Sequence, residues 1–292
     1  MTQLRRRALR LCLMASLAAP VAAAARQYPV RGMVVAVNRP GHTFTASIEA
    51  IPGFMQAMTM PFAVRQSGDL DGLAPGATVE FTLVVEPQTS YAEQIRVVRF
   101  QNVEQDPFAA SRLTLLREIA SGAAAVRSLA IGDDVPDFRL TDQRKRPIAI
   151  SDLRGKVVAV NFIYTRCALP NFCLRLVNHF GALQKRFKRQ LGRDLVLLTV
   201  TFDPVHDTPD VLANYARQWH ADAAGWHFLT GEETEIQRAC RLFGVHAFAD
   251  EGLMDHLLHT VIIDRYGKLL ANIEGNQFTA VQLGDLTERA LR

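Results

Sequence analysis

The chain has few cysteines, no long apolar run after its N-terminus and almost no excess of charge. Four of its 292 residues are cysteine, so a disulfide framework cannot hold so large a chain together. Beyond the N-terminus, no segment approaches the ~18 unbroken apolar residues of a membrane-spanning helix. The 49% hydrophobic content excludes a disordered chain. We therefore expect a globular protein of about two domains.

The small charge excess comes from the N-terminus. The formal net charge of +4 reflects 33 basic and 29 acidic side chains. Residues 1–25 contain four arginines and no acid, which leaves 29 basic against 29 acidic side chains in the rest of the chain. Such a balance gives no electrostatic attraction for a phosphate backbone, so we expect no nucleic-acid partner.

Residues 1–25 have the pattern of a secretory signal peptide. A basic start ends at Arg10, an apolar stretch follows at 11–19, and small residues occupy 22–25. We predict cleavage after one of the alanines at 23–25 and a periplasmic mature protein. The alternative is an uncleaved signal that anchors the chain to the membrane.

Period-two alternation with intervening turn residues marks a first domain at residues 28–104. Five short strands in about 75 residues predict a small OB-like β-barrel, since closure removes unpaired edges. The expected strands are Met33–Val37, Thr43–Ile48, Met58–Val64, Thr78–Val85 and Ile95–Phe100.

Two methionines on one of these strands are candidate ligands for a soft metal. Met58 and Met60 alternate across Thr59, so both thioethers point to one face of a strand. Thioether sulfur is uncharged and soft, and it selects Cu(I) or Ag(I) over hard cations. The alternative is that the methionines only fill the core.

The string Ala57-Met58-Thr59-Met60, preceded by Ile51-Pro52, resembles the CusF-type periplasmic copper-binding barrels over nearly the whole segment. In that family, two methionines of this motif and a histidine one strand earlier bind the metal, and a tryptophan lies against it. The resemblance implies copper at Met58 and Met60.

The histidine and the tryptophan of that family do not carry over. Ser47 and Ile48 occupy the histidine region, and Met55 stands near the tryptophan position. A replacement imidazole could come from His42 in the neighbouring turn.

Strands alternating with helices predict an α/β domain at 129–292, joined to the first domain by a helical linker at 105–128. The apolar runs Val157–Ile163 and Leu195–Thr201 are typical of buried central strands. Further expected elements are helices at Leu174–Leu191, at Pro209–Trp219 and near Thr279, and a hairpin of Thr260–Asp264 with Leu269–Ile273.

Two cysteines flank the turn after the first central strand of this domain. Cys167 follows the strand, and Cys173 lies near the start of the next helix. A helix N-terminus carries about half a positive charge, which lowers the pKa of a thiol. A strand, a cysteine pair and a helix form the thioredoxin-like arrangement for thiol chemistry.

A histidine takes the place of the proline loop that faces the cysteines of ordinary thioredoxins. The segment Met254–Thr260 has no proline and contains His256. Five residues separate the cysteines, where ordinary thioredoxins have two. Two thiolates and one imidazole make a three-coordinate soft site suited to copper.

Several strings of this domain resemble the Sco (SenC) family of copper proteins that assemble cytochrome c oxidase. The strings are Gly132–Phe138, Gly155-Lys156, Tyr164–Cys167, Asp203–Pro209 and Asp255-His256. The resemblance covers most of the domain. It departs in the cysteine spacing, because the family has three intervening residues where this chain has five.

The Sco resemblance implies copper, as Cu(I) or Cu(II), bound by Cys167, Cys173 and His256, with Asp203 and Asp255 near the site. It implies a periplasmic metallochaperone whose acceptor is the binuclear copper site of cytochrome c oxidase subunit II. The protein would deliver copper there, or keep the cysteines of that site reduced. Another copper acceptor remains open.

The same cysteines leave other functions open. In a thiol:disulfide oxidoreductase, Cys167 would attack a disulfide, Cys173 would resolve the mixed disulfide, and His256 would act as a base. The string Thr165-Arg166-Cys167 loosely resembles peroxiredoxins, so a peroxidase is a variant of this alternative. A copper buffer without an acceptor is a third interpretation. We expect structural roles for His259 and Cys240.

Overall fold

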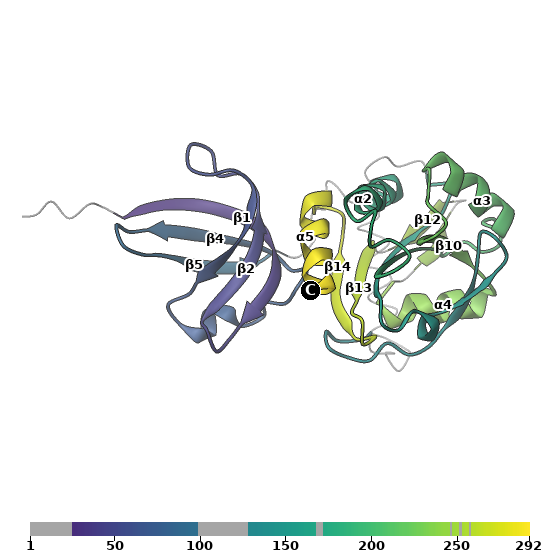
Figure 1. Ribbon diagram of the computed structural model, residues 1–292, viewed down its shortest axis with the longest axis horizontal. Coiled ribbons are helices and arrows are strands. Elements are labelled where there is room, and N and C mark those ends of the chain that lie inside the picture. Colours follow the sequence, from purple (N-terminus) through teal and green to yellow (C-terminus); the bar gives the residue numbers. More distant parts are fainter. Residues whose placement is uncertain (1–24, 99–127, 168–171, 246, 251–252, 257) are drawn as a thin grey trace, which may run out of the picture.

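The computed structural model describes residues 25–98, 128–167, 172–245, 247–250, 253–256 and 258–292. They form two bodies that lie side by side (Figure 1). The predicted signal peptide and the helix of the linker fall outside the described residues. Among the described residues, no helix is long and apolar enough to cross a bilayer. The domain boundaries stay predictions.

The N-terminal body is one antiparallel sheet in the order β3-β2-β1-β4-β5. An isolated bridge between Val64 and Ala92 joins its two edges, so the sheet curls around the rings of Phe44, Phe62 and Phe81. The five-stranded fold is confirmed, although the last strand begins earlier than predicted. The strands are β1 (Arg26–Asn38), β2 (Thr43–Ile48), β3 (Met58–Ala63), β4 (Thr78–Val85) and β5 (Ser90–Val97).

The C-terminal body contains a seven-stranded mixed sheet in the order β14-β13-β8-β9-β10-β6-β7. The three central strands β8, β9 and β10 run parallel, and the others pair antiparallel. The strands are β6 (Arg139–Asp142), β7 (Pro147–Ala149), β8 (Val157–Ile163), β9 (Leu195–Thr201), β10 (Trp226–Thr230), β13 (His259–Ile263) and β14 (Leu269–Glu274).

Helices cover both faces of this sheet. Phe180 of α2 and Tyr215 of α3 contact the neighbouring rings of Trp226 and Phe228, so α2 and α3 share a face. Phe243, just after α4, contacts Phe162 of β8, whose ring lies on the opposite face of the sheet from Trp226. The thioredoxin-like α/β prediction is confirmed, although α2 ends before the predicted Leu191. The helices are α2 (Cys173–Arg186), α3 (Pro209–Gln218), α4 (Glu233–Leu242) and α5 (Ala280–Leu291).

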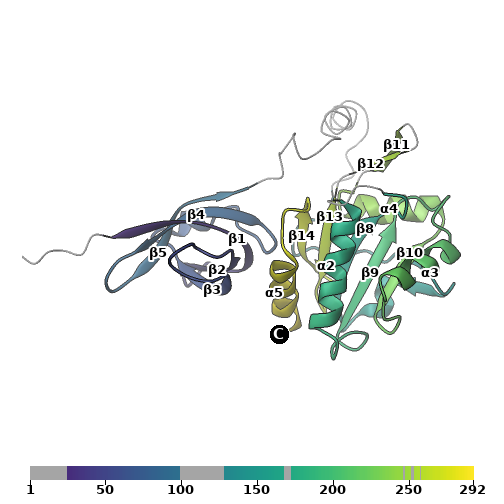
Figure 2. The same cartoon turned by 90° about the horizontal axis from the view of Figure 1, so that it is seen from above.

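A separate hairpin precedes β13. It consists of β11 (Ala247–Asp250) and β12 (Leu253–His256), with Ala247 opposite His256. In Figure 2 this hairpin stands apart from the seven-stranded sheet. Of the hairpin, the structure describes the backbone alone.

The two bodies meet along β14 and α5 (Figure 2). Met33 of β1 is fully buried and packs in the core of the C-terminal body. Gly76 has φ +88°, and a Cβ there would lie 3.0 Å from Cγ1 of Ile273, so bare backbone is needed for this close approach. Arg31 Nη2 donates to Gln277 Oε1 at 2.9 Å. A packed seam therefore joins the bodies.

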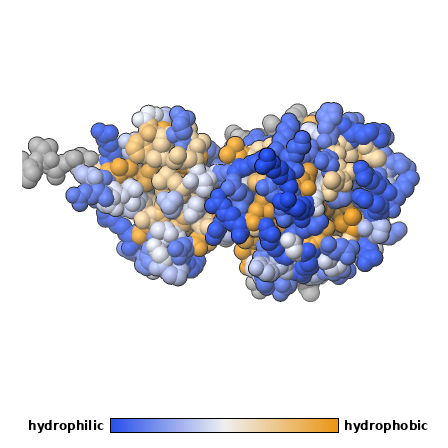
Figure 3. Space-filling view, viewed as in Figure 1, coloured by the Kyte–Doolittle hydropathy of each residue, from blue (hydrophilic) through white to orange (hydrophobic). Residues whose placement is uncertain are grey.

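The exposed surfaces of the two bodies differ in character. On the face shown in Figure 3, hydrophilic residues dominate the C-terminal body, whereas mildly hydrophobic residues gather on the N-terminal body.

Candidate metal-binding sites

Cys167 and Cys173 come together where β8 ends and α2 begins. Cys173 is the first residue of α2, and Cys167 N donates to Tyr164 O at 3.3 Å in the turn after β8. Both side chains are buried, and a hydrogen bond links the two thiols. The five-residue spacing thus still allows contact between the sulfurs. Residues 168–171 between them lie outside the described residues.

Burial controls the acidity of Cys173. It raises the pKa of this thiol well above its usual range, and the hydrogen bond and charge of Cys167 raise it further. The expected lowering by the helix N-terminus is wrong for this residue, because the desolvation of a buried thiolate outweighs the helix dipole. A metal that binds here must displace the thiol proton, so metal uptake releases protons.

A buried carboxylate holds the turn that leads to Cys167. Asp207 accepts hydrogen bonds from Thr165 N at 3.0 Å, from the Thr165 hydroxyl, and from the Thr201 hydroxyl on β9. The sequence analysis missed this role. Thr208 caps α3 by accepting from Val211 N, which leaves Asp207 free to fix the turn.

Asp203 lies beside the same turn, and its carboxylate is already engaged. It accepts a hydrogen bond from Arg166 Nη2 at 2.7 Å, and its other oxygen lies 2.8 Å from His206 Nδ1. Burial acts to raise the pKa of Asp203, but the hydrogen bonds from His206 and Arg166 outweigh it and hold the pKa below its usual range. The ion pair of Asp203 and Arg166 therefore borders Cys167.

Topology places His256 and Asp255 at the edge that carries the cysteines. β12 ends at His256, and β13 begins three residues later. Because β13 runs antiparallel to β8, the start of β13 lies beside the end of β8 that leads to Cys167. The side chains of Asp255 and His256 lie outside the described residues. Within the part that is described, no three His, Cys, Asp or Glu side chains group as a metal site.

Two further candidates have the structural roles expected of them. His259 is buried, and its Nδ1 lies 2.8 Å from Asn272 Oδ1. Cys240 is buried on α4, and burial raises the pKa of its thiol to about 12. A thiol this weakly acidic stays protonated and packs as a small hydrophobic side chain.

Met58, Met60 and Phe62 share one face of β3, and Phe62 packs in the core of the N-terminal body. Met58 pairs with Ile48, and Met60 pairs with Ala46. Met60 packs half-buried against the core, whereas 48% of Met58 is exposed. Both thioethers therefore lie on one face of β3, and the Met58 side chain is open to solvent.

Neither the position of Ser47 nor that of His42 supplies an imidazole to the two thioethers. Ser47 pairs with Thr59, and its hydroxyl donates to Asp285 Oδ2 at 2.6 Å. His42 precedes Thr43, which pairs with Ala63 at the other end of β3. At ~3.3 Å per strand residue, this end lies about 17 Å from Met58. The suggestion of His42 as a replacement ligand is therefore wrong.

Comparisons with known proteins cover both bodies. The family model described as SCO1/SenC matches residues 131–291, and the one described as copper binding periplasmic protein CusF matches 27–97. The SCO1 protein homolog of Bacillus subtilis is 27% identical over 151 residues, which cover 50% of this chain and 76% of that protein. A SCO2-like protein of Rickettsia felis is 29% identical over 141 residues, covering 46% and 66%.

A solved structure agrees with these matches. A SCO1/SenC family lipoprotein from Bacillus anthracis is 25% identical, with a TM-score of 0.50, and its match covers 58% of this chain and 100% of that one. Copper is the metal that the description of the N-terminal family names. Because the SCO1/SenC match spans more than half of the residues, the chain belongs to the SCO1/SenC family and carries a CusF-like region at its N-terminus.

Proposed function

We propose that the protein is an exported copper metallochaperone whose acceptor is the binuclear copper site of cytochrome c oxidase subunit II. The observation that carries the proposal is the buried pair of cysteine thiols, in contact with each other, in a member of the SCO1/SenC family. The predicted signal peptide supports delivery in the periplasm, as does a match to a family described as periplasmic.

Cys167, Cys173 and His256 hold the copper of the C-terminal domain in this proposal. Thiolate sulfur and imidazole nitrogen suit copper, and the thiols already contact each other. Copper is the cargo here and leaves with the acceptor. Asp203 and Asp255 border the site, and the bonds of Asp203 to Arg166 and His206 favour a role in charging its rim.

Met58 and Met60 form a second site for Cu(I) in the N-terminal domain. Their donors are neutral and soft, which suits Cu(I) and disfavours Cu(II). With no charged donor in the pair, we expect this site to bind more weakly than the dithiol site.

A Cu(I) titration against a competing chelator tests the proposal. The reduced protein is compared with the Cys167→Ser/Cys173→Ser variant, and Cys240→Ala serves as the control for loss of a buried thiol outside the site. Two equivalents falling to one support both sites, and one falling to none restricts the proposal to the dithiol. Copper binding that is unchanged in the double variant overturns it.

Delivery is tested with a metal-free soluble fragment of oxidase subunit II. Copper that moves from the loaded protein to the fragment, faster than from the chelator alone, supports the chaperone function. Retention of copper by the protein favours a copper buffer.

The contact between Cys167 and Cys173 also favours a second candidate, a thiol:disulfide oxidoreductase. Cys167 thiolate attacks a partner disulfide and releases one partner thiol. Cys173 then attacks the mixed disulfide, releases the second thiol and leaves an internal disulfide. Turnover of a disulfide or a peroxide by the copper-free protein, with an added thiol reductant that reduces the internal disulfide again, would favour this function.

A further inference from the structure

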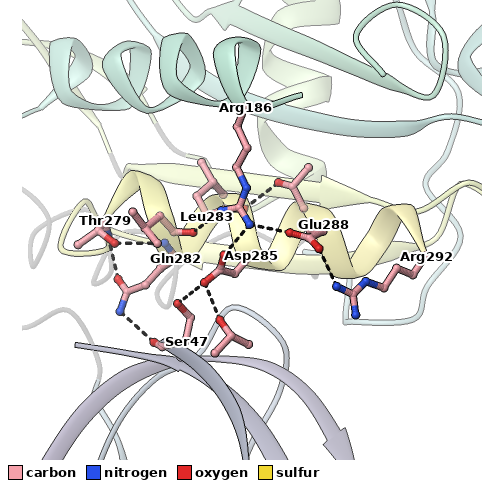
Figure 4. A network of polar contacts seen from close by, with 11 residues as sticks. Ser47, Arg186, Thr279, Gln282, Leu283, Asp285, Glu288 and Arg292 are labelled. Atoms are coloured by element: carbon pink, nitrogen blue, oxygen red, sulfur yellow. Dashed lines mark hydrogen bonds and ion pairs between the residues drawn. The ribbon is translucent and has the colours of Figure 1, made fainter. Parts of the chain in front are cut away.

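A polar cluster at the seam between the two bodies centres on Asp285 of α5 (Figure 4). Its Oδ2 accepts hydrogen bonds from the hydroxyls of Ser47 and Thr59, each at 2.6 Å. Its Oδ1 accepts from Arg186 Nη2 of α2 at 2.7 Å. One carboxylate therefore ties two strands of the N-terminal body to two helices of the C-terminal body.

The surroundings of Asp285 fix its side chain in this position. Arg186 also donates to Glu288 at 2.7 Å, and Gln282 Nε2 donates to Ser47 O at 3.3 Å (Figure 4). Burial acts to raise the pKa of Asp285, but the hydrogen bonds from Ser47, Thr59 and Arg186 outweigh it and keep the pKa below its usual range. The carboxylate is ionised, and hydrogen bonds to an ionised acceptor are the stronger kind.

Thr59 lies between the two thioether residues. Successive side chains of a strand point to opposite faces, so a Thr59 hydroxyl held against α5 turns Met58 and Met60 to the other face. β3 is an edge strand with one ladder partner, β2. Asp285 therefore supplies the start of β3 with a fixed contact on the side that faces the C-terminal body.

Two other contacts of the seam involve β1 instead of β3. Met33 packs in the core of the C-terminal body from β1, and Arg31 donates to Gln277. The seam thus offers a control position outside the methionine strand.

We infer that Asp285 is a positioning residue for the thioether site, through the hydroxyl of Thr59. The C-terminal domain holds the strand segment that presents Met58 and Met60, so Cu(I) affinity in the N-terminal domain depends on docking between the domains. This inference rests on the proposed binding of Cu(I) by the two methionines. By thermodynamic linkage, Cu(I) at the thioethers strengthens the docking by the same factor.

The test uses the full chain in the Cys167→Ser/Cys173→Ser background, in which the thioether site is read alone. Cu(I) affinity is measured by competition with a chelator. Thr59→Val keeps the shape and removes the hydroxyl, and we expect about 10-fold weaker binding, as for loss of an outer contact to a ligand. Thr59→Ser restores the affinity. Gln277→Ala removes a seam contact away from β3, so it should weaken the affinity less than Thr59→Val does.

A double-variant comparison distinguishes positioning from general damage. Because Thr59 and Asp285 act through one bond, adding Asp285→Ala to Thr59→Val should weaken Cu(I) binding no further than the stronger single change. Cu(I) should also slow hydrogen exchange of the β3 amides in the parent more than in Thr59→Val.

Two negative outcomes would have different consequences for the inference. If Thr59→Val lowers the melting temperature but leaves Cu(I) affinity unchanged, the positioning role is overturned while the thioether site stands. If the parent binds no Cu(I), the thioether site itself is overturned, and this inference with it.

Discussion

The two candidate metal sites differ in the chemistry of their sulfur and in their access to water. The thiols of Cys167 and Cys173 are 6% and 0% exposed, whereas Met58 is 48% exposed. A thiol must lose a proton to bind metal, and burial makes this loss harder. A thioether has no proton to lose. We therefore expect metal loading to depend on pH in the C-terminal domain and to be independent of pH in the N-terminal domain.

The largest expected effect comes from removing the candidate sulfur ligands of one site at a time. Cys167→Ser/Cys173→Ser should weaken Cu(I) binding in the C-terminal domain by about 1,000-fold or more, about 4 kcal/mol, because both charged soft donors are lost. Met58→Leu/Met60→Leu should leave that site unchanged. Chelator competition measures both, and equal losses in the two variants would mean that the sites are not independent.

Acid should destabilise the C-terminal domain before it affects the N-terminal one. Burial, assisted by the charge of Arg175, lowers the pKa of His179 from 6.5 to about 4. Between these values the unfolded chain binds more protons than the folded one, so stability falls as pH falls. The loss reaches about 3 kcal/mol near pH 4.

Urea unfolding followed by tryptophan fluorescence measures this loss, since both tryptophans lie in the C-terminal domain. His179→Gln removes this titrating group and should reduce the dependence in this window, and burial of His227, which also lowers its pKa, leaves a remainder. The lowered pKa of Asp285 acts at lower pH, below its usual 3.8. If the pH dependence of stability persists unchanged in the His179→Gln variant, other groups cause it.

The pH dependence of Cu(I) affinity should separate the two sites directly. At the dithiol site the raised pKa of Cys173 keeps its thiol protonated at neutral pH. Affinity there should rise about 10-fold per pH unit for each proton displaced, or about 100-fold from pH 6 to pH 8 for one proton. At the thioether site it should stay flat. The measurement is a chelator competition corrected for protonation of the chelator.

The smallest expected effect concerns a feature that the two sites share. Each has a threonine one or two residues from a candidate sulfur ligand, and the threonine hydroxyl donates to a carboxylate, Thr165 to Asp207 and Thr59 to Asp285. Thr165→Val should lower the free energy of unfolding by about 1–2 kcal/mol, because the carboxylate of Asp207 is buried and loses a donor. Thermal unfolding measures it, with Thr165→Ser as the control that keeps the hydroxyl.

Elements with strong local patterns could be predicted from the sequence. The continuous apolar runs of β8 and β9 match the predicted bounds, as do the alternating β2 and β4. The sequence analysis did not predict β6 or β7. Both are short, and three of the four residues of β6 are polar, so its strand conformation depends on pairing with β10 and β7.

The sequence by itself determined the candidate sulfur ligands and their local setting, because spacing, strand alternation and turn residues act over a few neighbours. Only the tertiary structure decided the acidity of Cys173, since burial depends on the whole core. It also decided the anchoring of Thr59, whose partner Asp285 lies 226 residues away. No local periodicity specifies such a contact, which forms because two separately folded surfaces pack together.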